Sequence, residues 1–237
     1  MNNWNPKIDE NLNDLKGFVF IAIILFLLVI DIYASPIKIE SYINIKNCDK
    51  IIEKENYSIC YSYKNNGPLY TLYNLDGELV NKNNIKKRPR FYEESTLPLK
   101  YQVKSYQYTN IGYNRGHLTS DASFDYSLPS LQSVYTMANI IPQVPQVNAH
   151  KNLWAGLEIK ERELAVLYKT IVVINKVNYP SSPHTSQFLK GSSVVIPSSF
   201  EKHFITDNIK TCYKIENKYY EIVPNNIELF KIVCPKD

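Results

Sequence analysis

A run of uncharged, mostly aliphatic residues from Phe18 to Ile30 divides the 237-residue chain into a short N-terminal segment and a long remainder. The run is shorter than the ~20 residues that a membrane-spanning helix needs, and it matches the apolar stretch of a secretory signal. Ala34 offers a small residue for cleavage, whereas the few cations before the run favour an uncleaved anchor. We therefore expect a signal peptide or signal anchor over residues 1–34 and one domain over residues 35–237.

Both alternatives place the domain outside the cytoplasm: periplasmic, secreted, or tethered and facing outward. A membrane is a partner only if the segment stays uncleaved. All four cysteines lie in the remainder and none forms a C-x-x-C pair, which favours disulfides in an oxidising compartment over a metal finger. Of the three pairings, the local one is the simplest, and four reduced, buried thiols are the alternative. The local pairs are Cys48 with Cys60 and Cys212 with Cys234.

The charge of the chain is mildly positive. The whole sequence has 27 Lys and Arg against 23 Asp and Glu; residues 1–34 hold two of the former and four of the latter, so residues 35–237 carry 25 − 19 = +6. An excess of this size is compatible with an anionic partner such as nucleic acid, but does not require one. With 44% hydrophobic residues and 7 Gly, the chain is neither disordered nor collagen-like.

Short alternating stretches predict β-strands on both sides of one long helical pattern, which runs from about Asn148 to Tyr168. The predicted strands cover residues 58–63, 69–73, 101–108, 170–177, 193–196, 211–215 and 219–223. An order of strands, one central helix and strands again predicts an α+β fold with a largely antiparallel sheet.

The strongest local motif is Asn114-Arg115-Gly116-His117. An imidazole titrates near pH ~6.5 and can take a proton from water, and a guanidinium fork binds phosphate oxygens, so His117 and Arg115 together suit phosphodiester chemistry. Two further motifs follow in the chain: Asn139-Ile140-Ile141-Pro142-Gln143, and a helical segment with Asn148, Trp154 and Glu158.

These three ordered motifs resemble the DNA/RNA non-specific endonuclease family of the ββα-metal, or His-Me finger, superfamily, whose motifs are D-R-G-H, N-I-x-P-Q and N-x-x-x-W-x-x-x-E. The resemblance implies a ββα-metal core with one metal-site helix. It implies His117 as the general base and a single divalent cation, usually Mg²⁺ with Mn²⁺ as a substitute. Glu158 would order metal-bound waters, and Asn139 would support the geometry of the site.

An arginine upstream of the first motif also matches the family pattern. Arg88 resembles the residue that stabilises transition-state charge, and Arg90 is its nearby competitor. The basic run formed by Lys86, Lys87 and these two arginines is either a solvated surface or a phosphate contact. DNA and RNA would be bound through backbone phosphates.

The chain departs from the family motifs at two points. Asn114 stands where the family has Asp, so a carboxylate near the metal site is replaced by an amide. The helix Asn should precede Trp154 by four residues, but Asn148 precedes it by six, and His150 occupies the expected place. Asn148 preserves the ligand type, whereas His150 would share a helix face with Trp154 and Glu158. Asn152 is a third candidate ligand.

The reading from sequence is therefore an exported, Mg²⁺-dependent nuclease that cleaves DNA and RNA with little sequence preference. The alternative is an exported nucleic-acid-binding module of the same fold that has weakened or lost catalysis, as in a surface receptor for DNA uptake; Asn114 and the altered spacing motivate it. Of the remaining prominent residues, Trp154 is predicted to be a core anchor, and His184 and His203 are predicted to lie on the surface.

Overall fold

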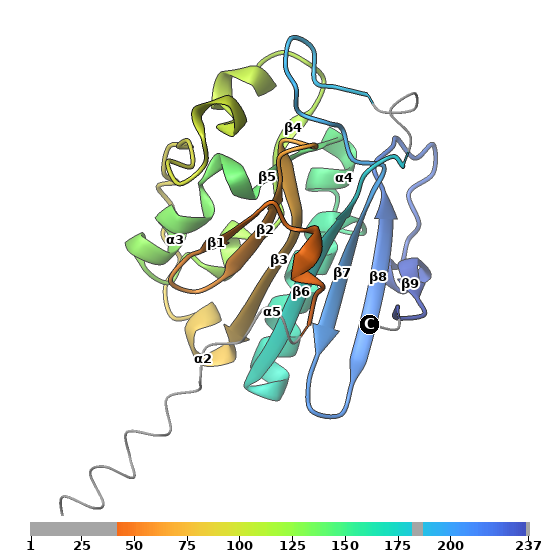
Figure 1. Ribbon diagram of the computed structural model, residues 1–237. Helices are drawn as coiled ribbons and strands as arrows, with labels where there is room; N and C mark the ends of the chain where they lie inside the picture. The colour runs from red at the N-terminus through yellow and green to blue at the C-terminus, as the bar shows by residue number, and fades with distance from the viewer. Residues whose placement is uncertain (1–41, 182–186, 236–237) are drawn as a thin grey trace, which may run out of the picture. The chain divides into compact units, whose positions relative to one another are not determined.

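The computed structural model describes residues 42–181 and 187–235 (Figure 1). The predicted leader and His184 lie outside the described residues, so the structure does not address them. In the part of the chain that is described, no helix combines the length and apolar character needed to cross a membrane.

A seven-stranded sheet with every neighbouring pair antiparallel forms the centre of the domain, in the order β1-β2-β3-β6-β7-β8-β9. A separate two-stranded antiparallel sheet joins β4 to β5. The strands are β1 (Lys50–Glu53), β2 (Ser58–Ser62), β3 (Gly67–Asp76), β4 (Asn114–His117), β5 (Ile140–Gln143), β6 (Thr170–Asn178), β7 (Ser199–Ile205), β8 (Lys210–Glu216) and β9 (Lys231–Ile232).

The longest helix, α5 (Trp154–Tyr168), lies along one face of the large sheet, behind β6 and β7 in Figure 1. Short helices and 3-10 turns fill the connections. They are α2 (Gly77–Val80), α3 (Leu128–Val134), α4 (Pro145–Ala149), η2 (Ile45–Asn47), η3 (Leu99–Tyr101), η4 (Ser105–Tyr108), η5 (Asp121–Ser123), η6 (Met137–Asn139) and η8 (Ile227–Phe230).

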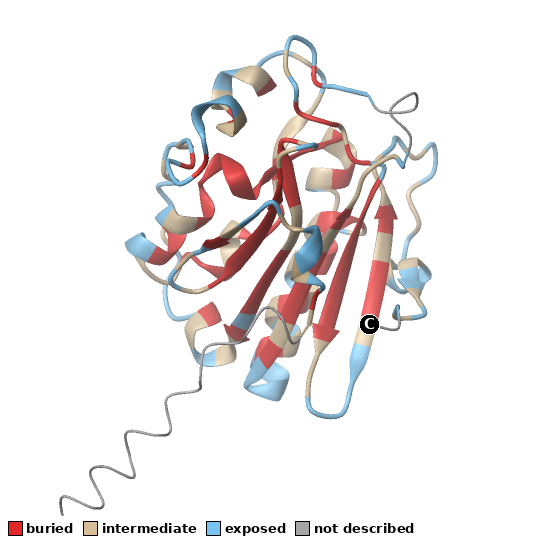
Figure 2. Cartoon of the chain, viewed as in Figure 1, coloured by how far each residue is buried: buried red, intermediate tan, exposed pale blue. Residues whose placement is uncertain are grey.

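The main core lies between the large sheet and α5, where the strands are buried along most of their length (Figure 2). Trp154, at the start of α5, is 1% exposed and meets Phe200 of β7 edge to face at 5.6 Å between ring centroids. The prediction that Trp154 is a core anchor is therefore confirmed. Because this core ties α5 to the sheet, residues on the first turns of α5 have a fixed place relative to β4.

Both predicted disulfides are present. Cys48 is bonded to Cys60 of β2, and Cys212 of β8 is bonded to Cys234, which follows β9. The described chain has no free cysteine. One bridge therefore closes each edge of the large sheet, and the local pairing expected from sequence is confirmed.

Four of the seven predicted strands correspond to β2, β3, β6 and β8, but three are wrong. Residues 101–108 comprise the last residue of η3, a short link and the whole of η4, where single aromatic rings pack, as Tyr101 does on Tyr63 at 4.0 Å between ring centroids. Residues 193–196 form only an isolated bridge, and residues 219–223 form no strand. Strand β7 was not predicted, because Glu201, Lys202 and His203 gave it a polar centre.

The predicted helix from Asn148 to Tyr168 is also wrong at its start. Helix α4 ends at Ala149, and α5 begins at Trp154. Between them the chain makes a turn in which the N–H of Leu153 donates to the carbonyl of His150 at 2.9 Å. A further correction concerns His203, which is 6% exposed and contacts Glu201 at 3.0 Å, so it is not a surface histidine.

Candidate active site

His117 lies at the end of β4, in the two-stranded sheet that β4 forms with β5, opposite Ile140. Gly116, the residue before it, allows this close pairing: a Cβ there would lie 2.1 Å from Oε1 of Gln143, whose side chain is fully buried on β5. Asn114 opens the same strand opposite Gln143. The glycine of the first motif is thus required by packing between the two motif strands.

Two aromatic rings and two charged groups surround the His117 imidazole. Its ring centroid is 4.8 Å from that of Tyr135 and 5.5 Å from that of Phe91. Burial lowers the pKa of His117 to about 4, with Asp121 opposing the shift and Arg88 adding to it. The Nε2 atom is buried without a hydrogen-bond partner among the described residues. A neutral imidazole with an unused ring nitrogen is competent to accept a proton at neutral pH.

Arg88 joins the site through two carboxylates. Its Nε lies 3.1 Å from Oδ2 of Asp121, and its NH1 lies 3.1 Å from Oδ2 of Asp125. Tyr135 donates from its hydroxyl to the same Asp121 carboxylate at 2.9 Å. These contacts, and its electrostatic effect on His117, place Arg88 beside the imidazole. Arg90 is exposed and makes no ion pair within the described chain.

Helix α5 brings Glu158 to the same region. Trp154 donates from its indole N–H to the carbonyl oxygen of His117 at 3.1 Å, which joins the start of α5 to the end of β4. One turn later, burial raises the pKa of Glu158 to about 8; Glu161 and Asp121 add to the shift, and Lys202 and Arg162 oppose it. Glu158 is thus a carboxyl group whose negative charge is poorly compensated by the protein.

The three candidate metal ligands lie before α5 rather than on it. Asn148 is the fourth residue of α4, a helix that contacts both β4 and α5. His150 follows α4, so the expected helix face shared by His150, Trp154 and Glu158 does not exist. Its Nδ1 accepts a hydrogen bond from the N–H of Asn152 at 3.1 Å. Asn152 donates from its amide to the carbonyl of Pro224 at 3.0 Å, so its side chain holds the C-terminal segment.

The chemistry of these groups fits a hard divalent cation. Asn148 offers an amide oxygen that has no hydrogen-bond partner within the described chain, and Glu158 offers a carboxylate whose pKa is raised by burial. Mg²⁺ prefers such oxygen donors and keeps several water ligands. The Nε2 atom of His150 offers a nitrogen ligand as an alternative. The described residues contain no cluster of three or more His, Cys, Asp or Glu side chains suited to a metal.

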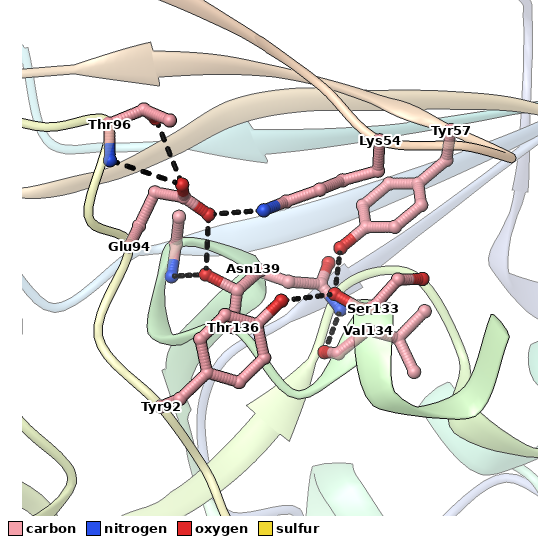
Figure 3. A network of polar contacts seen from close by, with 10 residues as sticks. Lys54, Tyr57, Tyr92, Glu94, Thr96, Ser133, Val134, Thr136 and Asn139 are labelled. Atoms are coloured by element: carbon pink, nitrogen blue, oxygen red, sulfur yellow. Dashed lines mark hydrogen bonds and ion pairs between the residues drawn. The ribbon is translucent and has the colours of Figure 1, made fainter. Parts of the chain in front are cut away.

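Asn139 is a structural support in the geometry observed. It is fully buried in η6; its Oδ1 accepts from the N–H of Thr119 at 2.9 Å, and its Nδ2 donates to the carbonyls of Thr119 and Val134 at 3.0 and 2.9 Å. Figure 3 shows it beside a polar network in which Glu94 binds Lys54 and accepts from Thr136 at 3.0 Å. This network fixes the segment that leads into β5, and so the strand that pairs with His117.

Arg115 is turned toward its own loop. Its Nε and NH2 donate to the carbonyl of Ser105 at 3.0 and 2.7 Å, and NH2 also donates to Thr109 at 3.0 Å. The guanidinium therefore holds η4 against β4. A contact between Arg115 and a phosphate stays a prediction, as do the roles of His117, Arg88, Asn139 and Glu158.

Sequence reasoning missed several charged groups of the site. Asp121, four residues after His117, carried no motif of its own. Arg162 had a usable signal, because it follows Glu158 by one helical turn; its NH1 is buried without a partner among the described residues. Glu161 and Lys202 had no such signal, because the strand that carries Lys202 was not predicted and nothing in the sequence indicates that the two side chains are buried together.

Comparison with known proteins agrees with this geometry. The DNA/RNA non-specific endonuclease family matches residues 38–235, nearly all of the described chain. The chain belongs to this family. The family match covers β4, η6, β5 and α5 together, the elements that carry His117, Asn139 and Glu158.

Named relatives are more distant. Human mitochondrial Endonuclease G is 27% identical over 120 residues, covering 51% of this chain and 40% of the relative. The mitochondrial nuclease of Saccharomyces cerevisiae is 25% identical over 164 residues, covering 65% and 50%. A nuclease of a Nostoc species is 25% identical over 144 residues, covering 60% and 48%. The chain thus spans about half the length of the curated relatives it matches.

Among solved structures, the crystal structure of an EndoG/EndoGI complex, described as showing the mechanism of EndoG inhibition, matches with a TM-score of 0.66. The match covers 77% of this chain and 80% of that chain at 20% identity, so it bears on the fold. With the family match, it confirms the α+β, ββα-metal architecture predicted from the three motifs.

Proposed function

We propose that this protein is an exported, metal-dependent nuclease that hydrolyses phosphodiester bonds of DNA and RNA with little sequence preference. The observation that carries the proposal is the meeting of His117, Arg88 and Glu158 at one site in a chain of the DNA/RNA non-specific endonuclease family. Binding through backbone phosphates is supported by the exposed Lys86, Lys87 and Arg90, which precede the site on one loop.

In the proposed reaction, a water oxygen attacks phosphorus and one P–O ester bond breaks. His117 takes the proton of the attacking water, because burial keeps its imidazole neutral at pH 7. Arg88, which Asp121 and Asp125 orient, would stabilise the added charge on the phosphoryl oxygens. Tyr135 and Phe91 restrict the orientation of the imidazole ring.

Asn148 and Glu158 would hold the divalent cation, directly and through water. When bound, the cation would polarise the scissile phosphate and stabilise the leaving oxygen. We propose Mg²⁺, with Mn²⁺ as a substitute, because the donors are an amide oxygen and a carboxylate. His150 is the alternative ligand, since its Nε2 remains available when Nδ1 accepts from Asn152.

The export of the protein is supported by the apolar run and by the two disulfides, which are typical of an oxidising compartment. We propose that the domain is periplasmic, secreted or anchored facing outward. A binding module without catalysis is the second candidate, favoured by Asn114 in place of the family Asp and by the engagement of Arg115 with Ser105.

The direct test is digestion of plasmid DNA by the purified protein, with Mg²⁺ and with EDTA. We expect cleavage only with the metal. Plasmid that stays intact with Mg²⁺, Mn²⁺ and Ca²⁺, together with salt-sensitive DNA binding, would select the binding module instead. RNA run in parallel determines whether both nucleic acids are substrates.

The ligand assignment is tested by two matched variants. If Asn148 binds the ion, Asn148→Ala should raise the Mg²⁺ concentration needed for half-maximal activity, and His150→Ala should leave it near the wild-type value. The reverse result would assign the ion to His150. Calorimetric titration of Mg²⁺ into the DNA-free proteins gives the same comparison without relying on turnover.

A further inference from the structure

Two fully buried charged residues, Glu161 of α5 and Lys202 of β7, lie behind the proposed site and are paired with each other. Both side chains have 0% exposure, and the Lys202 ammonium also lies 4.8 Å from the centroid of the Trp154 ring. Removing two charges from water carries a large desolvation penalty that their attraction must offset, and well-packed apolar residues are often as stable. Stability alone therefore gives no reason to keep this pair.

The Glu161 carboxylate connects α5 to three other elements. One oxygen accepts a hydrogen bond from Ser123 of η5 at 2.5 Å. The other accepts from the Tyr73 hydroxyl of β3 at 3.0 Å and binds Lys202 of β7. Both carboxylate oxygens are thus used in a site without solvent, where such bonds hold their partners firmly.

Each member of the pair reaches His117 through one intermediate element. Glu161 holds Ser123, and the same 3-10 turn carries Asp121, the carboxylate beside His117 that also binds Arg88 and Tyr135. Lys202 packs on Trp154, whose indole N–H donates to the His117 carbonyl at 3.1 Å. The contacts of Glu161 thus lead to the Asp121 carboxylate, and those of Lys202 lead to the backbone of His117.

We propose that the Glu161–Lys202 pair is a positioning element for hydrolysis: through Ser123 it sets Asp121 against His117, and through Trp154 it sets the end of β4. The inference rests on the proposed nuclease function. Neither side chain has an exposed atom with which to touch substrate, so both are positioning residues. A small misplacement of reacting groups can cost on the order of 10²-fold in rate.

The test separates positioning from stability by replacing the whole pair. Single substitutions leave one buried charge without its partner and destabilise the protein for that reason alone. The double variant Glu161→Leu/Lys202→Met removes both charges and keeps an apolar core. We expect it to melt higher than Glu161→Leu alone, although the Ser123 and Tyr73 hydroxyls lose their acceptor, with kcat at least 10-fold lower and KM within about twofold of wild type.

Ser123→Ala is the second, milder variant, since it removes only the link to η5 and keeps the ion pair. We expect a lower kcat, an unchanged KM and little change in melting temperature. The control is Lys160→Met/Glu228→Gln, which removes a partly exposed ion pair between α5 and η8, with a 2.7 Å separation, and should leave kcat unchanged.

Wild-type kcat in both the folded double variant and Ser123→Ala would overturn the inference. If the double variant fails to fold, Ser123→Ala decides by itself: an unchanged kcat overturns the inference and a loss confined to kcat supports it. Wild-type protein that cleaves nothing would instead overturn the proposed function, and this inference with it. If wild type is active and both variants have the same kcat as wild type, only the positioning role is contradicted, and the proposed function stands.

Discussion

His117 illustrates how local packing can keep a side chain in its neutral form. Its ordinary pKa lies near ~6.5, and burial against Phe91 and Tyr135 lowers it to about 4, even with Asp121 nearby. The imidazole is therefore neutral throughout the physiological range, and its Nε2 has no partner among the described residues. If His117 is the base, His117→Ala should lower kcat by about 10²- to 10⁴-fold in plasmid digestion without reducing DNA affinity.

The lowered pKa also predicts the pH dependence of the reaction. A general base works only when unprotonated, so kcat/KM at saturating Mg²⁺ should stay level from pH 8 down to about pH 5 and fall as the pH approaches 4. A pH–rate profile measured on a short DNA substrate tests this. An acidic limb centred near pH ~6.5 would mean that the imidazole behaves as an ordinary exposed histidine.

Glu158 shows the opposite shift and connects stability to metal binding. Its pKa in the folded protein is about 8, above the usual value of 4.5, so between these two values the folded state binds more protons than the unfolded state. Stability from this group is thus present below pH 4.5 and lost as the pH rises through 8. Glu158→Gln should therefore melt higher than wild type in EDTA at pH 8, and by less at pH 5.

Mg²⁺ should reverse this difference. A cation near the carboxylate favours its charged form, so Mg²⁺ should raise the melting temperature of wild type more than that of Glu158→Gln. The variant should also lose most of its activity. Equal melting temperatures of the two proteins in EDTA at pH 8 would contradict the raised pKa.

At the scale of elements, the pairing of β4 with β5 depends on Gly116. Since an added Cβ would lie 2.1 Å from Oε1 of Gln143, Gly116→Ala must displace the buried Gln143 side chain or separate the strands. We expect a loss of about 1–3 kcal/mol in the free energy of unfolding, measured by urea denaturation. Adding Gln143→Ala removes the clashing atoms and should recover part of the loss; purely additive effects would argue against this contact.

The elements also show why some of the site was predictable from sequence. The motif residues lie on β4, on η6 with the following β5, and on α5, and their order in the chain is enough to identify the family, so His117, Asn139 and Glu158 could be proposed. The ligand register could not, because the turn between Ala149 and Trp154 interrupts a pattern that reads as one helix. Asp121 and Lys202 could not either, since tertiary packing alone brings them to the site.

The strands of the large sheet likewise include some that could be predicted from sequence and one that could not. Strands with clear alternation, such as β3 and β6, were predictable, because their apolar residues face the core at every second position. Strand β7 was not, since Lys202 occupies a core position beside Phe200 and Phe204 and is stabilised there by Glu161. Alternation of apolar residues thus fails to predict a strand where the fold buries polar residues near the site.

For the whole molecule, the two disulfides stabilise the edges of the large sheet, which lie far along the chain from one another. Cys48–Cys60 closes 12 residues and Cys212–Cys234 closes 22, which in the chain-entropy model gives about 3 kcal/mol each. Cys212→Ser/Cys234→Ser should thus lower the free energy of unfolding by about that amount in denaturant titrations. Neither bridge touches His117, Arg88 or Glu158, so kcat at 25 °C should stay near wild type while the protein remains folded. A large loss of kcat in the folded variant would show that the β8–β9 edge supports the site itself. A free energy of unfolding equal to that of wild type would show that packing alone holds this edge of the sheet.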